Sequence, residues 1–307
     1  MPLVSLPDRS WVTDLGAVPG LELVTWDLGE PPPRGNEIAV VVPPYLDPDQ
    51  RLDLLGTLPR LELVQLLTAG YDNVASHVHH GVTLCSGGGI HDASTAELAL
   101  TLILASLRGV PDFVRAQDRQ QWIPTRIWPA LADRRVLIVG YGKVGRAIAA
   151  RLLPFETTVT AVASRARPGD ELVGEVHGID QLPTLLPDQD VVVVITPLTD
   201  TTAGLVGRDF LATMKDGALL VNMARGRVAD TDALVAEAAS GRLLAAVDVT
   251  DPEPLPPDHP LWTIPNVLVS PHVGGASTAF RPRALALVRR QLAAYAEGRP
   301  LDHVVSG

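Results

Sequence analysis

The chain has 307 residues, of which 46% are hydrophobic and 20% charged, and its formal net charge is −10 at neutral pH. The length favours two domains of roughly 100–200 residues, and the composition excludes a disordered or fibrous protein. No Lys/Arg-rich block accompanies the negative charge, which argues against nucleic-acid binding because neutralising phosphates needs a basic face.

The N-terminal residues, the longest apolar run and the cysteine content give no indication of a membrane or an oxidising compartment. The N-terminal "MPLVSLPDRSW" lacks a signal-peptide pattern, and the longest apolar run, residues 96–107, is too short to span a bilayer. Cys85 is the only cysteine, and its apolar setting is typical of a buried strand residue rather than a nucleophile. We therefore expect a cytoplasmic protein with no membrane partner.

Residues 1 to about 36 are rich in proline and glycine and carry only short apolar pieces. Three apolar runs then predict buried strands, at residues 37–42, 61–67 and 81–86. A strongly helical pattern starts at Ser94, where "STAE" fits a capping box. These elements predict one small α/β unit followed by a helix that can bridge two domains.

A second series of strands follows the polar, tryptophan-bearing segment of residues 119–135. Apolar runs alternate with helical patterns and predict at least six buried strands of one sheet, at residues 136–140, 158–164, 190–197, 218–224, 243–249 and 266–272. Residues 284–298 predict an amphipathic helix ended by Gly298, and the piece after it is expected to return to the first unit.

The most informative motif is "VLIVGYGKVGRAIAARL", in which Gly140, Gly142 and Gly145 stand between a strand and a helix. The first glycine permits a tight turn, the second a close backbone approach to a pyrophosphate, and the third close packing of helix on strand. The helix N-terminus faces the anion. The flanking strand and helix, and a second strand ending about 20 residues on, predict a dinucleotide site.

Three polar residues follow later strands of the same series. Arg225 comes after "ALLVNMA", Glu253 lies in "DVTDPEPL" and His272 in "SPHVGGAST". Each alone is typical of a structural position, but ligands of open α/β sheets bind outside the carboxyl ends of the strands. An arginine can hold a carboxylate, a histidine can exchange a proton, and a carboxylate can orient its ring. Together they suit the reduction of a 2-oxo acid by hydride.

The sequence resembles the D-isomer-specific 2-hydroxyacid dehydrogenases. The resemblance covers nearly the whole chain in order and spacing, through the motifs "LLTAGYDNV", "STAELAL", "GYGKVG", "TPLTDTTAGLV", "NMARGRV", "DVTDPEPL", "SPHVGGAST" and "YAEGRPLDHVV". It implies two similar α/β parallel-sheet domains, Rossmann-like and flavodoxin-like, with a cleft between them. We expect a discontinuous substrate domain of about residues 1–97 and 280–307, and an inserted dinucleotide domain of about 98–279. A homodimer formed by the dinucleotide domains is also implied.

The resemblance assigns roles residue by residue. It implies that Arg225 binds the substrate and polarises its carbonyl, that His272 is the acid/base and that Glu253 is its partner. The substrate carboxylate would meet the backbone at Ala69 and Gly70. Asp248 would contact the nicotinamide carboxamide, and the remaining cofactor-binding positions are expected at Gly140, Gly142, Lys143, Val144, Gly145, Ser164, Arg165, Arg167, Thr196, Pro197, Ala224 and Gly274.

The segment "SRARP" decides the expected cofactor. The acid that usually grips the adenine ribose at the end of the second strand is replaced by Ser164, with Arg165 and Arg167 close behind. A hydroxyl and guanidinium groups match a 2′-phosphate, so the segment favours NADP over NAD, although NAD use stays open. The alternative is a solvated basic loop.

The departures from the family pattern affect the pocket rather than the chemistry. Thr250 stands where an aromatic residue is common, and Ser86 where asparagine is frequent. His91 and Asp92 are expected to edge the cleft. Histidines 77, 79 and 80 lack a partner cluster and the family chemistry is metal-free, so we predict a solvated turn and no metal site.

Several functions stay open at this stage. Reduction of glyoxylate or hydroxypyruvate is the leading hypothesis, and a 3-phosphoglycerate dehydrogenase without a regulatory domain is an alternative. Formate dehydrogenase is disfavoured because it carries glutamine where Glu253 stands. A corepressor-like protein that senses the dinucleotide without turnover is the alternative from another functional class.

Overall fold

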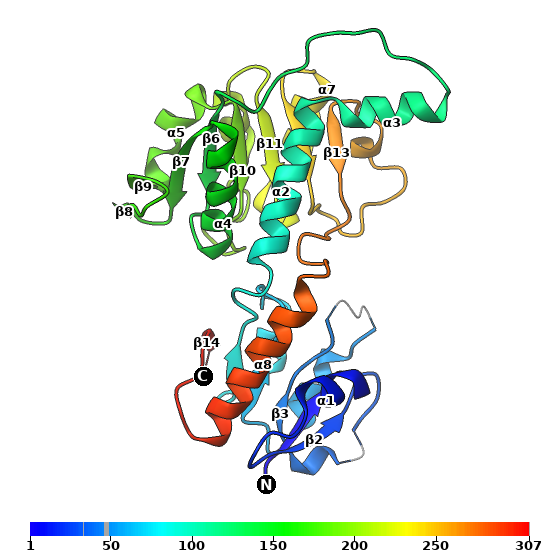
Figure 1. Ribbon diagram of the computed structural model, residues 1–307, viewed down its shortest axis with the longest axis vertical. Helices are drawn as coiled ribbons and strands as arrows, with labels where there is room; N and C mark the ends of the chain where they lie inside the picture. Colours follow the sequence, from blue (N-terminus) through cyan, green and yellow to red (C-terminus); the bar gives the residue numbers. More distant parts are fainter. Residues whose placement is uncertain (33, 46–48, 307) are drawn as a thin grey trace. The chain divides into compact units, whose positions relative to one another are not determined.

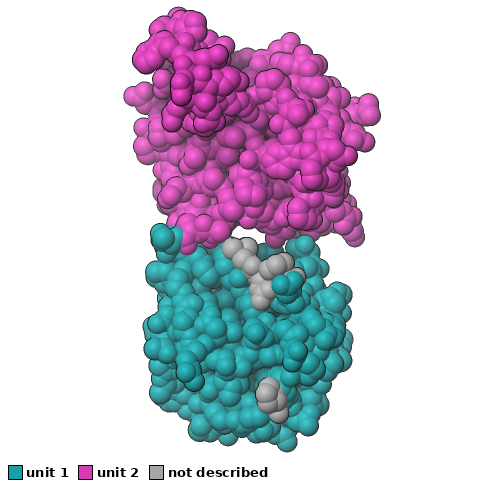
Figure 2. Space-filling view, turned by 90° about the vertical axis from the view of Figure 1, so that its right-hand side faces the viewer, with its two compact units in different colours: residues 1–91, 278–307 teal, residues 92–277 magenta. Residues whose placement is uncertain are grey.

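The computed structural model describes residues 1–32, 34–45 and 49–306. The chain forms two compact units: unit 1 contains residues 1–91 and 278–307, and unit 2 contains residues 92–277 (Figure 2). The chain passes between them six residues before the first predicted boundary and two before the second. The first difference arises because helix α2 (Asp92–Leu107) packs on α4 (Lys143–Leu152) of unit 2 along its length, so its first turn belongs there.

Unit 1 is built on a sheet with the strand order β14-β5-β4-β3-β1-β2, which is parallel except for β14. Without β14 this is the flavodoxin-like order. The strands are β1 (Leu3–Leu6), β2 (Glu22–Thr25), β3 (Ile38–Val41), β4 (Leu63–Gln65), β5 (Thr83–Cys85) and β14 (Val304–Ser306). Helices α1 (Arg9–Leu15) and α8 (Phe280–Ala296) pack together in this unit, and short 3-10 turns occupy Gly35–Glu37, Leu52–Thr57 and Ala75–His77 (Figure 1).

A buried amide network ties the C-terminal segment to unit 1. The amide of Gln291 on α8 donates to Gln65 Oε1 at 2.6 Å and to the carbonyl of Asp302 at 2.9 Å. Gln65 in turn donates to the carbonyls of Leu66 and Ser86. Two fully buried amides are thereby satisfied, which explains why the last piece of chain pairs with β5. The return of this piece to the first unit is confirmed.

Unit 2 is built on a sheet with the order β13-β12-β11-β10-β6-β7-β9-β8, parallel except for β8. From β12 to β9 this is the doubly wound order of dinucleotide-binding domains, with β13 added at one edge and the switch point between β6 and β10. The strands are β6 (Arg135–Val139), β7 (Thr158–Ala163), β8 (Arg167–Pro168), β9 (Glu175–Gly178), β10 (Val191–Val194), β11 (Leu219–Asn222), β12 (Leu244–Val247) and β13 (Val267–Val269).

Helices flank this sheet (Figure 1). Besides α2 and α4 they are α3 (Val110–Asp118), α5 (Leu182–Leu185), α6 (Arg208–Thr213) and α7 (Thr231–Ala239), with 3-10 turns at Leu153–Phe155, Ile179–Gln181, Leu186–Asp188, Gly226–Val228 and Pro260–Trp262. Within the described ranges no single helix is long and apolar enough to cross a membrane, and α2 and α3 reach that length only as a pair bent by 69°.

Two sequence expectations differ from the structure. The glycine- and proline-rich start of the chain forms β1, α1 and β2, which the short apolar pieces did not predict. The capping box at Ser94 is wrong, because α2 begins at Asp92 and the Ser94 hydroxyl bonds Ser277 Oγ at 2.7 Å. The buried strand position of Cys85 is confirmed, and burial raises the pKa of its thiol to about 11.

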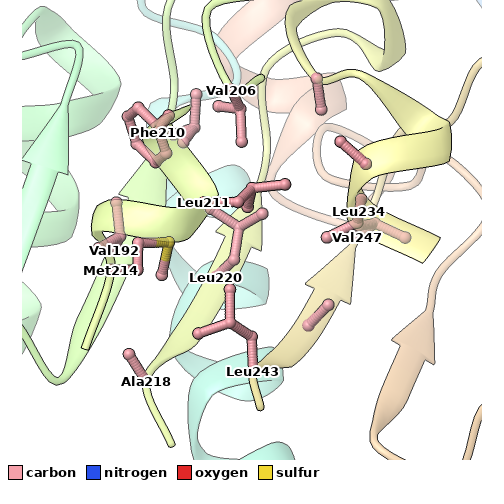
Figure 3. Close-up of a cluster of buried hydrophobic side chains, with 14 of the residues drawn as sticks. Val192, Val206, Phe210, Leu211, Met214, Ala218, Leu220, Leu234, Leu243 and Val247 are labelled. Atoms are coloured by element: carbon pink, nitrogen blue, oxygen red, sulfur yellow. The ribbon is translucent and has the colours of Figure 1, made fainter. Parts of the chain in front are cut away.

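Both faces of the unit 2 sheet are covered by apolar layers. On one face, side chains of β10, β11 and β12 pack against α6 and α7, as Figure 3 shows for Val192, Leu220 and Val247 around Leu211 and Leu234. On the other face, α2 and α4 cover alternate residues of the same strands. Since the strands are buried on both faces, they read as continuous apolar runs in the sequence.

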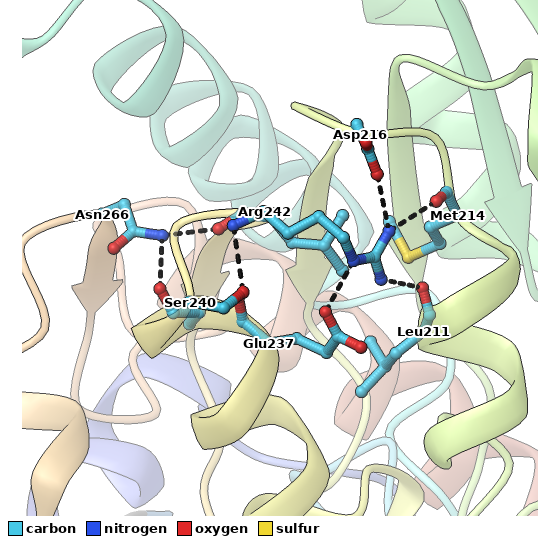
Figure 4. Close-up of polar contacts among 9 residues, drawn as sticks. Leu211, Met214, Asp216, Glu237, Ser240, Arg242 and Asn266 are labelled. Atoms are coloured by element: carbon cyan, nitrogen blue, oxygen red, sulfur yellow. Dashed lines mark hydrogen bonds and ion pairs between the residues drawn. The ribbon is translucent and has the colours of Figure 1, made fainter.

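Arg242 joins three segments at the base of this core (Figure 4). Its guanidinium donates to the carbonyls of Leu211 at 2.5 Å and Met214 at 2.8 Å, and to Glu237 Oε2 at 2.6 Å. The Arg242 side chain is 23% exposed and that of Glu237 24%. The hydrogen bonds from Arg242 therefore fix the end of α6 to the turn that precedes β12.

We expect Arg242→Met to lower the free energy of unfolding by about 2–3 kcal/mol, because two helix-end carbonyls and one carboxylate lose a charged donor. Chemical denaturation measures this change. Arg208→Met is the matched control, since Arg208 is exposed and should change stability by no more than about 0.5 kcal/mol. Equal effects of the two substitutions would contradict a structural role for Arg242.

Candidate active site

The glycine loop follows β6 at the switch point of the unit 2 sheet. Gly140 has φ of +115°, and a Cβ there would lie 2.5 Å from the carbonyl oxygen of Ile195. A Cβ on Gly145 would lie 2.3 Å from the Gly140 oxygen, whereas one on Gly142 would meet nothing within 4 Å. The first and third glycines are thus required by packing, and the second leaves open space beside the loop.

The N-terminus of α4 adds donors next to that space. The helix starts at Lys143 with Gly142 as its cap, and no side chain caps it. The first-turn N–H groups of such a helix favour an anion, and Val144 and Gly145 lie in this turn. Across the switch point, Thr196 Oγ1 is buried and has no hydrogen-bond partner in the described part of the chain. These features fit a bound dinucleotide.

The segment after β7 forms a hairpin against the glycine loop. Ser164, Arg165 and Arg167 directly follow the strand and are exposed. The guanidinium of Arg167 donates to the main-chain carbonyl of Tyr141 at 2.6 Å, so this arginine is held beside the loop. Arg165 lies in the short connection between β7 and β8, one residue after Ser164.

Asp170 completes this hairpin and was not singled out by the sequence. Its carboxylate accepts from the Tyr141 hydroxyl at 3.0 Å, from Arg146 Nε at 3.1 Å and from the N–H of Leu172 at 2.9 Å. The Leu172 N–H, then the Tyr141 hydroxyl, lower the pKa of Asp170, while burial raises that of Tyr141 to about 12. Arg146 also pairs with Glu171, so its charge is neutralised locally.

Arg225 is held at the carboxyl end of β11 by its own turn. Asn222, the last residue of the strand and fully buried, accepts from the N–H of Ala224 at 3.1 Å. The Arg225 side chain donates to the carbonyl of Ala224 at 2.9 Å. A Cβ on Gly226 would lie 1.8 Å from the Thr250 carbonyl oxygen, so only glycine allows this turn to pack on the loop after β12.

His272 and Glu253 form a pair across neighbouring loops. Nδ1 of His272 lies 2.5 Å from Oε1 of Glu253, and the side chains are 43% and 39% exposed. A carboxylate only accepts, so Nδ1 carries the proton and Nε2 is the atom that can exchange one with a ligand. The pairing that motif order predicted is present in the structure.

The backbone of His272 is in an unusual conformation that Asp248 supports. Its φ is 53°, in the left-handed region that non-glycine residues rarely adopt. The buried Asp248 carboxylate accepts from Ser270 Oγ at 2.6 Å and from the N–H groups of Val273 and Gly274 at 2.9 and 2.8 Å. Its carbonyl accepts from the N–H of His272 at 2.7 Å. Asp248 therefore organises the loop that presents the histidine.

The expected carboxylate-binding residues Ala69 and Gly70 follow β4 in unit 1, whereas the other predicted site residues lie in unit 2. Pro197 follows Thr196 after β10 and its carbonyl accepts from the Thr202 hydroxyl at 2.6 Å. Among the described residues no group of three potential metal ligands lies together. His79 instead contacts the carbonyl of Gly56.

Comparison with known proteins identifies the family. The family model described as "D-isomer specific 2-hydroxyacid dehydrogenase, NAD binding domain" matches residues 100–274. The chain belongs to the D-isomer-specific 2-hydroxyacid dehydrogenases. It is an NAD(P)-dependent oxidoreductase that acts on 2-oxo acids, and unit 2 is its NAD-binding domain.

Relatives in this family match over nearly the full length of both chains. The human glyoxylate reductase/hydroxypyruvate reductase is 31% identical over 296 residues, which are 91% of this chain and 89% of the relative. Glyoxylate reductase of Aeropyrum pernix is 31% identical, covering 93% of this chain and 90% of its own.

Solved structures of the family share the fold. A 2-hydroxyacid dehydrogenase of Xanthobacter autotrophicus, solved with NADPH and MES, is 30% identical with a TM-score of 0.81 and covers 99% of this chain and 97% of its own. An NADPH-dependent glyoxylate/hydroxypyruvate reductase of Sinorhizobium meliloti, solved with NADP and sulfate, is 26% identical with a TM-score of 0.83, covering 99% and 98%.

We expect Asp248→Asn to lower kcat by at least about tenfold, because an amide oxygen cannot replace both carboxylate oxygens and the loop carrying His272 loosens. The Kd for NADPH should stay within about threefold, and Ser270→Ala, which removes one of the three donors, should have a smaller effect. Steady-state kinetics and fluorescence titration measure the two constants. A weaker Kd with unchanged kcat would instead favour a direct contact of Asp248 with the nicotinamide.

Replacing Glu253 by glutamine tests the pairing with His272. The substitution keeps an acceptor near Nδ1 but removes the charge that stabilises the protonated ring. We expect Glu253→Gln to lower kcat for reduction by at least about tenfold, while the Kd for NADPH stays within about threefold. Steady-state kinetics and fluorescence titration of both proteins measure the two constants, and an unchanged kcat would count against the pair.

Proposed function

We propose that this dehydrogenase reduces a small 2-oxo acid, with glyoxylate or hydroxypyruvate as the leading substrate, and that it prefers NADPH. The observation that carries the proposal is the His272–Glu253 pair at the carboxyl edge of the same sheet that holds the glycine loop. The relatives named as glyoxylate and hydroxypyruvate reductases support the substrate class. Reduction of a small 2-oxo acid needs groups that bind its carboxylate and one group that donates a proton.

The proposed reaction assigns one task to each side chain. A nicotinamide held at the glycine loop would supply the hydride for C2 of the 2-oxo acid. Arg225 binds the carboxylate and draws electron density onto the carbonyl oxygen, which its planar fork of donors can do in one geometry. His272 gives its Nε2 proton to that oxygen, and Glu253 stabilises the ring while it is charged. The product is a 2-hydroxy acid, and the proton and hydride account for both added hydrogens.

The preference for NADPH rests on the hairpin after β7. Ser164 stands where a ribose-binding acid would repel a 2′-phosphate, and Arg167 is held at the glycine loop by its bond to Tyr141. The nearby Arg146 is neutralised by Asp170 and Glu171. Arg165 and Arg167 therefore supply the positive charge for a phosphate at this point. The relatives solved with NADPH or NADP lend further support.

The proposed functional form is a homodimer through the dinucleotide domains. Its support is an apolar surface on α3 and the segment after it: the exposed fraction is 54% for Val114, 94% for Trp122 and 100% for Ile127. Figure 1 shows this segment as a long loop between α3 and β6. Large exposed apolar side chains are typical of an interface, and sedimentation of the wild-type chain measures its mass directly.

A cytoplasmic location stays a prediction from the sequence.

We expect Arg225→Ala to lower kcat/KM for the 2-oxo acid several hundredfold, which corresponds to a rise of about 3–4 kcal/mol in the activation free energy. NADPH binding should be retained. Arg227→Ala is the matched control, because Arg227 lies two residues away on the same turn and is exposed. Activity of the Arg225 variant within a few-fold of wild type would refute its assignment.

The double variant Arg165→Ala/Arg167→Ala tests the cofactor preference. Each charge-assisted bond contributes about 1.5–3 kcal/mol before solvent screening, so wild type should favour NADPH by tenfold to a few hundredfold. The variant should lose NADPH efficiency selectively, keep NADH efficiency, and show a weaker salt dependence. Equal or better efficiency of wild type with NADH would mean that the two arginines form only a solvated surface.

A further inference from the structure

The loop after β4 is fixed at its start and exposed at its tip. The carbonyl of Thr68 accepts from the N–H of Gly87 at 2.7 Å, and the Thr68 hydroxyl donates to the carbonyl of Gly70 at 2.7 Å. A Cβ on Gly87 would lie 3.0 Å from the carbonyl carbon of Leu67, so the two segments touch at the backbone. In the described ranges neither the N–H of Ala69 nor that of Gly70 has an acceptor. Adjacent backbone donors of this kind suit an anionic ligand.

His91 supports this loop through a hydrogen bond to the main chain at Leu67. Its side chain is buried, with the residue 6% exposed, and Nε2 lies 2.8 Å from the carbonyl oxygen of Leu67. Because a carbonyl oxygen only accepts, Nε2 carries the proton and donates it. The bond joins residues 24 positions apart and ends two residues before Ala69.

Two aromatic rings fix the orientation of the His91 ring. The Phe280 ring is stacked at a centroid distance of 5.4 Å with an interplanar angle of 3°, and the Tyr45 ring at 5.2 Å and 27°. Tyr45 and Phe280 also stack on each other at 4.1 Å. The three rings come from the loop after β3, the segment before α2 and the first residue of α8. Rings stacked in this way restrict the direction in which Nε2 can donate.

We propose that His91 is a positioning residue for the substrate carboxylate: it holds the Leu67 carbonyl so that the N–H groups of Ala69 and Gly70 are preorganised to bind that group. The inference rests on the proposed reduction of 2-oxo acids and on the predicted role of these two N–H groups. Preorganised donors lose less conformational freedom on binding, so the effect belongs in substrate affinity rather than in the chemical step.

His91→Phe keeps a stacked ring and removes the donor. We expect the KM for glyoxylate to rise by about tenfold, the change that corresponds to one lost hydrogen bond, while kcat stays within about threefold. The Kd for NADPH should not change, and an ethyl ester of the same 2-oxo acid should be affected less than the free acid. His91→Gln, which restores an N–H donor, should bring KM back toward the wild-type value.

A merely structural histidine would give another pattern. If His91→Phe lowers kcat and the melting temperature together, affects acid and ester alike, and is not rescued by His91→Gln, the proposal is wrong. It is also wrong if the variant leaves KM unchanged.

Ala69→Pro removes the N–H of Ala69 itself. This variant therefore tests whether the loop binds the carboxylate, independently of whether His91 positions the loop. If Ala69→Pro raises KM and His91→Phe does not, the loop binds the carboxylate without help from His91. If neither substitution changes KM, the loop does not bind the carboxylate. If wild type oxidises no NADPH with any 2-oxo acid, the proposed function fails before either variant is compared.

Discussion

The parallel strands of unit 2 are the constraint on which its chemistry depends. Strands β6 and β10 to β13 run in one direction, so the loops that follow them emerge at one edge of the sheet. The glycine loop, Thr196, Arg225, Glu253 and His272 all lie in such loops. Hydride transfer to a 2-oxo acid needs substrate binding, proton transfer and cofactor contacts close together. A parallel sheet places the loops that carry these groups at one edge.

Within that edge the loops support one another through main-chain contacts. Gly226 packs against the carbonyl of Thr250, which brings the Arg225 turn onto the loop after β12. Asp248, at the start of that loop, bonds the next loop at Ser270, Val273 and Gly274. The side chains proposed as catalytic are therefore positioned by a chain of buried backbone contacts. These contacts hold His272, the proposed acid/base residue, in a sparsely populated backbone conformation.

The sequence predicted most of unit 2 because its signals are local. Continuous apolar runs mark strands buried on both faces, and the glycine spacing marks the switch point. The pairing of Glu253 with His272 was also predictable, since both follow neighbouring strands. The prediction was weaker where structure depends on distant residues. Asp248 gave no sign in the sequence that it would bond a loop 22 to 26 residues away. Ser94 looked like a helix cap, but its hydroxyl bonds Ser277 instead.

We infer that this chain turns over 2-oxo acids and forms the D-isomer of the product, as its family name indicates. The most direct measurement is the configuration of the product formed from hydroxypyruvate and NADPH by the purified chain, determined by chiral chromatography while NADPH oxidation is followed. We expect stoichiometric NADPH consumption and formation of the D-2-hydroxy acid. Formation of the L-isomer, or no oxidation of NADPH or NADH with a panel of 2-oxo acids, would contradict it, and the second result would favour a dinucleotide-sensing protein.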